Sequence, residues 1–392
     1  MNPRIERLYQ IAKAPTRTIL GLMSGTSLDG LDLALVRFTG FGLDTSYEIL
    51  HYDTRPYPAD FKESIRSVFA KESIHFPTLS TLNAQIGRLH ASLILEVLAA
   101  WGVDPSEVDA IASHGQTVMH RPDRTGKLPH STLQIGDGDH IAQLTGIITL
   151  SDFRQKHIAA GGEGAPLAMF GDYFLFSKKG ENRILLNIGG IGNFTYLPAS
   201  GDPAGILVTD TGPGNTLIDA AVRRYFNQAY DEDGAIARSG KIDTGILAEL
   251  MSLSFFKDSF PKSTGPEYFN LDIVHGSISP ADLIATLTEF TAQSIALAMK
   301  TYIPSSVEGT VYVSGGGSKN PVIMARLAEL LPFRVCESDE LGMPSAAKEA
   351  VLFALLANET LADSPSSDRL GDSPWVNFGK ISLWRNFSKI LE

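Results

Sequence analysis

Two apolar runs, separated by a short stretch of small and polar residues, lie near the start of the chain. The runs are TILGLM, which begins at Thr18, and LDLALVRF, which ends at Phe38, and SGTSLDG stands between them. This pattern predicts a β-hairpin with a broad, glycine-bearing turn. A second pattern of this kind lies at residues 183–197, where RILLNI and NFTYL flank GGIG. The pair indicates an internal duplication, with one hairpin in each of two lobes.

The length of the chain also favours two lobes. Its 392 residues exceed the size at which a single hydrophobic core usually divides. Helical and strand-like segments alternate along it, and 36 glycines provide many turns, so we expect an α/β fold. The predicted N-terminal lobe covers residues 1–151 and is completed by residues 375–392, and the C-terminal lobe covers residues 152–374.

Composition argues against several classes of function. A net charge of −11 provides no basic surface for nucleic acid or for an anionic membrane, so we expect neither as a partner. The lone cysteine, Cys336, excludes an internal disulfide and a cysteine-based zinc cluster, and it favours a reducing compartment. The N-terminal segment lacks the apolar stretch of a signal peptide, and no run of about 18 apolar residues follows. We therefore expect a cytoplasmic protein.

The first predicted turn has the composition of a phosphate-binding loop. Small residues let successive backbone N–H groups converge on one anion. In MSGTSLDG, the hydroxyls of Ser24, Thr26 and Ser27 add donors, and Asp29 and Asp32 could orient water around a magnesium ion. A tight hairpin without a ligand would have a similar sequence, because glycine loops are common. The loop lacks the lysine of a P-loop, and no G-x-S-x-G nucleophile elbow is present.

Two further loops carry candidate functional residues. In VYVSGGGSKN, the three glycines would let a base and ribose approach the backbone closely, although an unliganded strand-to-helix turn would look alike. In TDTGPGN, Asp210 ends an apolar strand and is a candidate general base; an ordinary Asp turn or a helix cap is the alternative.

Polar residues that follow apolar segments resemble the wall of a site for a hydroxyl-rich ligand. They are His114, Gln116, Gln134, Asp137, Asp152, Arg154 and Glu163. Glu349 shares a helical face with Leu352 and Phe353, which predicts a buried carboxylate that needs a partner. A small shift in helix phase would instead place it on the surface.

Nine motifs, in order, resemble the anhydro-N-acetylmuramic acid kinase family. They are MSGTSLDGLD, SHGQTV, LQIGD, SDFR, GGEGAPL, LNIGGIGN, DTGPGN, PKSTGPEYFN and VSGGGSKNP, and the match as a whole runs from about residue 19 to residue 361. The resemblance implies two similar α/β lobes of the actin-like ATPase (ribonuclease H-like) type around an interdomain nucleotide cleft. The two predicted hairpins would then be the two phosphate loops.

The resemblance also implies an activity and its residues. ATP, with Mg²⁺, would phosphorylate O6 of 1,6-anhydro-N-acetylmuramic acid while water opens the anhydro bridge, giving N-acetylmuramic acid 6-phosphate and ADP in cell-wall recycling. Asp210 would activate the water, and a homodimer is implied. The expected substrate ligands are His114, Gln116, Asp152 and Glu349. The expected ATP contacts are Gly25, Thr26, Ser27, Leu28, Asp29, Gly30, Leu31, Asp32, Gly189, Gly190, Asn193, Gly315, Gly316 and Gly317.

Two segments depart from the family pattern. QKHIA follows SDFR, which places His157 where the family often has an acid, and LGMPSAAKE precedes Glu349 in place of a glycine-acid pattern. These departures leave open a kinase of the same fold that acts on another sugar. A non-catalytic nucleotide or sugar sensor is a further alternative, because a fold alone does not fix function.

Overall fold

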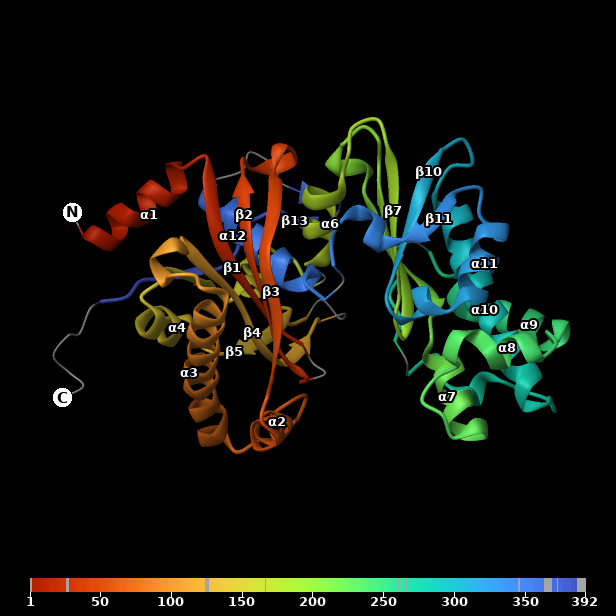
Figure 1. The fold of residues 1–392 in the computed structure, drawn as a ribbon. Coiled ribbons are helices and arrows are strands. Elements are labelled where there is room, and N and C mark those ends of the chain that lie inside the picture. The colour runs from red at the N-terminus through yellow and green to blue at the C-terminus, as the bar shows by residue number, and fades with distance from the viewer. Residues whose placement is uncertain are drawn as a thin grey trace. The chain divides into compact units, whose positions relative to one another are not determined.

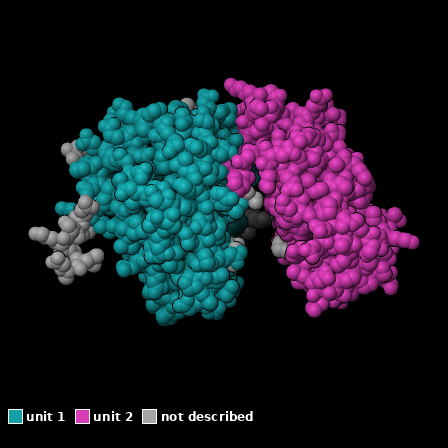
Figure 2. All heavy atoms as spheres, in the orientation of Figure 1, with its two compact units in different colours: residues 1–175, 346–392 teal, residues 176–345 magenta. Residues whose placement is uncertain are grey.

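A computed structural model describes residues 2–25, 28–123, 127–165, 167–259, 261–265, 267–344, 346–362, 369–371 and 373–385. The chain forms two compact units, shown in teal and magenta in Figure 2. Unit 1 comprises Met1–Leu175 and Ala346–Glu392, and unit 2 comprises Phe176–Ser345. These boundaries differ from those expected at residues 151 and 374.

Aromatic packing explains the difference at both boundaries. Phe170 lies 5.4 Å from Trp375 and 5.0 Å from Phe378, measured between ring centroids. Phe378 is fully buried, and His157 also contacts its ring. The segment after residue 151 therefore packs with residues 375–378 of unit 1. In the segment before residue 374, Phe353 contacts Phe153 at 5.3 Å between ring centroids, so this segment also belongs to unit 1.

The sheet of unit 1 has the order β14-β6-β4-β1-β2-β3, with β5 paired to β4. Strands β1, β2 and β3 form an antiparallel meander, whereas β4 and β6 run parallel to β1. Strand β14 pairs antiparallel with β6, so the C-terminal segment closes this edge. The strands are β1 (Thr16–Ser24), β2 (Gly30–Thr39), β3 (Ser46–Pro56), β4 (Ala110–Arg121), β5 (Ser131–Ile135), β6 (Thr149–Ser151) and β14 (Lys380–Ser382).

Helices cover both faces of this sheet (Figure 1). Alternation along β1 directs Leu20 and Leu22 toward helices α3 and α4, and places Gly21 against α12. A Cβ at Gly21 would collide with the carbonyl oxygen of Ala350, so α12 can approach β1 this closely only over a glycine. The helices are α1 (Pro3–Lys13), α2 (Ala59–Arg66), α3 (Phe76–Trp101), α4 (Gly138–Thr145), α5 (Phe153–Ala159), α6 (Ala168–Phe176) and α12 (Lys348–Ala362).

Unit 2 contains a five-stranded sheet with the order β11-β10-β7-β8-β9. Its helix α10 (Pro280–Tyr302) starts with a Ser279 cap and a proline in the first turn, and is buried on most of its surface, as expected for a helix in a core. The strands are β7 (Asn182–Ile188), β8 (Ile191–Leu197), β9 (Leu207–Pro213), β10 (Gly309–Ser314) and β11 (Arg334–Glu337). The remaining helices are α7 (Thr216–Phe226), α8 (Ala235–Ser239), α9 (Thr244–Met251) and α11 (Pro321–Leu330).

The two sheets repeat one topology. In each, three strands form an antiparallel meander, and two further strands add in parallel beside the first. Both predicted hairpins are present, as β1–β2 and β7–β8, and the predicted duplication is confirmed. Among the described residues, no helix combines the length and the apolar character that a membrane span requires.

Candidate active site

The turn between β1 and β2 is packed tightly at its described ends. Leu28 adopts a left-handed backbone conformation (φ 61°), its amide donates to Gly25 O (3.3 Å), and its side chain is 3% exposed. A Cβ at Gly30 would collide with the carbonyl oxygen of Arg55. Thr26 and Ser27, two of the predicted phosphate ligands, lie outside the described residues. The flanks of the turn are therefore fixed by packing and by backbone hydrogen bonds.

Burial of Leu28 is expected to hold the turn in place despite its backbone strain. The side chain enters a small core formed by residues of α2, α3, β4 and β5. Replacing Leu28 by alanine should lower the free energy of unfolding by about 2 kcal/mol, because the burial is lost while the strained conformation remains. Denaturant unfolding measures this change, with the exposed Leu95→Ala in α3 as control. Equal losses in the two variants would contradict the expectation.

Two carboxylates lie next to the turn: Asp29 directly precedes β2, and Asp32 lies in β2. Thr54 Oγ1 donates to Asp32 Oδ1 (2.6 Å). Burial raises the pKa of Asp32; the Thr54 hydrogen bond opposes this, and the negative charge of Asp29 adds to the rise. Leu31 is fully buried toward the sheet core, so only its backbone can meet a ligand. Asp29 and Asp32 thus form a pair that favours a nearby cation.

Glu349 lies in the first turn of α12, where its side chain is exposed, so the helix phase that places it on the surface is the one observed and the predicted buried carboxylate is wrong. Protein atoms around the carboxyl group partly desolvate it even though the side chain reaches the surface, and this raises the pKa of Glu349. The charge of Asp32 adds to the rise, and Arg154 and Lys348 oppose it. Arg154 Nε donates to His114 Nε2 (2.9 Å), and Arg154 Nη1 donates to Gly164 O (2.8 Å). Residues from β2, α5 and α12 are thereby coupled electrostatically within unit 1.

His114 and Gln116 have their polar atoms engaged inside the protein. His114 accepts from Arg154, so its Nδ1 carries the proton and donates to Gly115 O (2.8 Å). Burial and then Arg154 lower the pKa of His114 to about 3, so the ring is neutral. Gln116 accepts from Ser24 Oγ (2.5 Å) and donates to Gly25 O (3.4 Å). Both residues therefore support neighbouring groups of the site.

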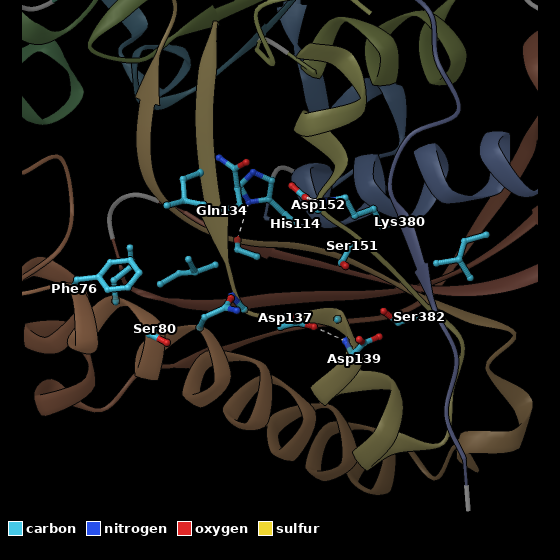
Figure 3. Close-up of a pocket in the computed structure, with 18 residues that line it drawn as sticks. Phe76, Ser80, His114, Gln134, Asp137, Asp139, Ser151, Asp152, Lys380 and Ser382 are labelled. Carbon is cyan, nitrogen blue, oxygen red and sulfur yellow. Dashed lines mark hydrogen bonds and ion pairs between the residues drawn. The ribbon is translucent and has the colours of Figure 1, made fainter. Parts of the chain in front are cut away.

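Unit 1 also contains a cavity of about 540 Å³ between the N-terminal half of α3 and strand β14 (Figure 3). Four of the predicted polar residues line it: His114, Gln134, Asp137 and Asp152. Asp152 begins α5 in a left-handed conformation (φ 57°) and forms an ion pair with Lys380. Gln116, Arg154, Glu163 and Glu349 are not part of its lining. The structure thus divides the predicted polar wall between this cavity and the Glu349 region.

In unit 2, the turn of the β7–β8 hairpin is joined to the TDTGPGN segment. Gly214 N donates to Gly190 O, and Asn215 N donates to Gly189 O, each at 2.8 Å. A Cβ at Gly214 would collide with the carbonyl oxygen of Gly189. Asn193 pairs with Asp210 in the β8–β9 register. The second glycine turn and the candidate base are therefore parts of one rigid assembly.

Asp210 is held by residues of the PKSTGPEYFN segment. Its amide donates to Lys262 O (3.1 Å), and its Oδ2 accepts from Thr264 N (2.7 Å). Burial raises the pKa of Asp210, and the hydrogen bond from Thr264 opposes the rise. Oδ1 has no hydrogen-bond partner among the residues that the structure describes. The carboxylate is thus oriented by one oxygen and has a lone pair available on the other, as a general base requires.

The glycine loop after β10 borders a second cavity, of about 400 Å³, within unit 2. Gly315 has φ 83°, and a Cβ there would lie 2.7 Å from Ile188 O. A Cβ at Gly317 would collide with the Ile188 side chain. Gly316 lines the cavity together with Asn215, Ile218, Asp219, Tyr230, Asp231, Glu232, Asp233, Lys319 and Asn320. Most of these residues were not predicted, since only Gly316, Lys319, Asn320 and Asn215 stand in recognised motifs.

The fold and these loops define the class of the protein. Each unit has the ribonuclease H-like strand order, with a glycine turn after its first strand, so the chain has the two-unit α/β fold of the actin-like ATPase type. A glucokinase structure from Streptomyces griseus matches it with a TM-score of 0.38 at 14% identity, over 87% of this chain and 99% of that chain.

The chain belongs to the anhydro-N-acetylmuramic acid kinase family, whose model matches residues 17–373. The kinase of that name from Pseudoalteromonas atlantica is 46% identical, over 98% of this chain and 100% of the relative. The one from Caldanaerobacter subterraneus is 39% identical, over 97% and 100%. Family membership makes the chain a kinase, that is, a phosphotransferase, and confirms the resemblance seen in the sequence.

Proposed function

We propose that the protein uses ATP to phosphorylate O6 of 1,6-anhydro-N-acetylmuramic acid while water opens the anhydro ring, giving N-acetylmuramic acid 6-phosphate and ADP. The observation that carries this proposal is Asp210, an oriented and partly desolvated carboxylate with one free oxygen. A simple sugar kinase needs a base for a substrate hydroxyl; here the substrate has no O6 hydroxyl, so the base must act on water. The relatives' names supply the substrate.

Asp210 would accept a proton from water as the water oxygen bonds to the anomeric carbon. The bond from that carbon to O6 breaks, and its electron pair stays on O6, which bonds to the γ-phosphorus of ATP. The bond from that phosphorus to the bridging oxygen breaks at the same time, and ADP leaves with its electron pair. The negative charge of Asp210 also stabilises the positive charge that develops at the anomeric carbon. One deprotonation therefore drives both the opening of the ring and the transfer.

The described residues fit MgATP in two respects. Burial raises the pKa of Asp32, and the repulsion between the negative charges of Asp29 and Asp32 adds to the rise. A Mg²⁺ ion held through water would lower that pKa by favouring the charged carboxylate. Gly189, Gly190 and Asn193 would face phosphates from unit 2, and Gly315, Gly316 and Gly317 would lie along the nucleoside. When bound, ATP supplies the phosphoryl group, and Mg²⁺ neutralises its charge. Among the described residues, no group of three His, Cys, Asp or Glu side chains is arranged to hold a metal ion.

The proposed sugar ligands fall into two groups: residues with a free carboxylate oxygen, which would bind the sugar directly, and residues whose polar atoms are already bonded within the protein. Glu349 has no protein hydrogen bond among the described residues and is the proposed direct ligand for sugar hydroxyls. We also propose Asp152 as a direct ligand. Its Oδ2 is paired with Lys380, so Oδ1 would bind the sugar. For His114 and Gln116 we propose an indirect role, in which His114 orients Arg154 and Gln116 holds the turn at Gly25. We also propose that the protein is a cytoplasmic homodimer that acts in cell-wall recycling.

The reaction is tested with isotopically labelled water. Incubation with ATP, Mg²⁺ and the anhydro-sugar in H₂¹⁸O should give the 6-phosphate with ¹⁸O at the anomeric carbon, detected by mass spectrometry. A product without the label would contradict hydrolytic ring opening. Absence of any product would contradict the substrate, and a panel of other amino sugars and anhydro-sugars would then identify a different kinase activity.

A further inference from the structure

A chain of four buried polar side chains runs from helix α3 to the turn after β1. Tyr57 Oη lies 2.8 Å from His90 Nε2 and 2.8 Å from Ser24 Oγ. Ser24 Oγ lies 2.5 Å from Gln116 Oε1. All four side chains are buried, and His90 is only 1% exposed. No sequence motif contains Tyr57 or His90, and neither has a role in the chemistry described above.

The donor and the acceptor of each hydrogen bond among these four side chains follow from the other bonds of Gln116. Gln116 Nε2 donates to Gly25 O and Thr117 O, so Gln116 Oε1 must accept the proton of Ser24. Ser24 therefore accepts from Tyr57, and Tyr57 accepts from His90 Nε2–H. His90 is thus the neutral tautomer protonated at Nε2, in agreement with burial, which lowers its pKa to about 4.

Tyr57 also holds the other end of the same turn. Its backbone N–H donates to Asp29 O (3.3 Å), while its hydroxyl supports Ser24, which directly precedes Gly25. The ring is 5% exposed and contacts Phe61 at 5.1 Å between centroids. One residue after β3 therefore links both described flanks of the turn to the core of unit 1.

A histidine at position 90 is unfavourable for packing alone, because one of its ring nitrogens is left unsatisfied by the described residues. His90 Nδ1 is buried and has no partner in the part of the chain that the structure describes. An unsatisfied buried polar atom costs about 1–3 kcal/mol, which a leucine or phenylalanine at this position would avoid. The cost is understandable if the donor at Nε2 is needed to orient the Tyr57 hydroxyl toward Ser24.

We propose that Tyr57, oriented by His90, is a positioning residue that sets the geometry of the Gly25 turn for the phosphates of the nucleotide. This inference rests on the proposed role of the turn in binding ATP. It predicts that loss of the Tyr57 hydroxyl weakens interactions with ATP selectively. Interactions with the sugar should change much less, because neither Glu349 nor Arg154 forms a hydrogen bond with any of these four side chains.

The test compares Tyr57→Phe with Tyr196→Phe, which removes a similar buried hydroxyl bond, to Asn182 Oδ1 (2.8 Å), in unit 2. We expect Tyr57→Phe to lower kcat/KM for ATP about 10-fold, the effect typical of groups that orient direct ligands, with KM for the sugar unchanged. Tyr196→Phe should leave both parameters unchanged. An equal loss for ATP and sugar, or no loss in Tyr57→Phe, would overturn the proposal.

A second pair of variants tests the role of His90 and allows for poor folding of the first. His90→Gln keeps a donor, and His90→Leu removes it; we expect the first to retain more ATP affinity than the second, measured by calorimetry with ATP and Mg²⁺ alone. Equal affinities would overturn the proposal. This measurement separates the two inferences, because a wild-type protein that binds ATP without phosphorylating the anhydro-sugar refutes only the proposed reaction. If the wild type does not bind ATP, both are refuted.

Discussion

Replacing Asp210 by asparagine is expected to lower kcat by about 10³-fold and to leave the affinity for ATP unchanged. Asparagine keeps the size of the side chain and can still accept the hydrogen bond from Thr264 N, but it cannot take a proton from water. Steady-state kinetics with the anhydro-sugar and calorimetry with ATP measure the two quantities. Asp272→Asn, an exposed change elsewhere in unit 2, is the matched control.

The pH dependence of Asp210 provides an independent readout. A base is active when deprotonated, so kcat/KM should rise with pH through the pKa of Asp210. Because burial raises that pKa, the acid limb should lie above the ordinary Asp value of about 3.9. The pH profile of kcat/KM for Asp210→Asn should lack this acid limb. An unchanged limb, or a full turnover rate in the variant, would remove Asp210 from the mechanism and favour a sensor or another base.

Replacing Gly21 by alanine is expected to lower the free energy of unfolding by about 3 kcal/mol, the upper part of the range for overpacked cores. The added Cβ would collide with the Ala350 carbonyl, which belongs to helix backbone and cannot rotate away. Thermal and denaturant unfolding measure the loss. Gly245→Ala is the control, since a Cβ there meets only the flexible Asp243 side chain, at 3.3 Å. A loss no larger than in the control would show that α12 can shift.

The hairpins and the repeated α/β organisation were predictable because apolar runs around a small-residue turn are local patterns. The strand that contains Asp210 was predictable for the same reason, but the prediction that it ends at Asp210 was wrong, because Gly212 and Pro213 continue its pairing with β8. The hydrogen bond from Thr264 to Asp210 was not, because 54 residues separate the two partners. Arg154 was recognised only as one polar residue among several. Its importance depends on the hydrogen bond to His114 and on electrostatic attraction to Glu349, which no local spacing encodes.

The unit boundaries were missed for a related reason. Helices α5 and α6 are short, and their apolar residues do not indicate which sheet they cover. The hydrogen bond of Arg154 to His114 assigns α5 to unit 1, and the aromatic contacts of Phe170 with Trp375 and Phe378 assign α6 to it. Tyr57 and His90 likewise lie 33 residues apart and meet through tertiary packing. Sequence patterns identified the loops, whereas the groups that hold those loops became visible only in three dimensions.

The discontinuity of unit 1 affects the order in which the protein can fold during synthesis. Strand β1 leaves the ribosome before unit 2, yet α12 and β14, which pack on or pair with its sheet, come after all of unit 2. Until they emerge, the face around Gly21 and the edge of β6 lack their native partners, while unit 2 is continuous and can form its core earlier. The nascent N-terminal sheet is therefore the segment most in need of a chaperone.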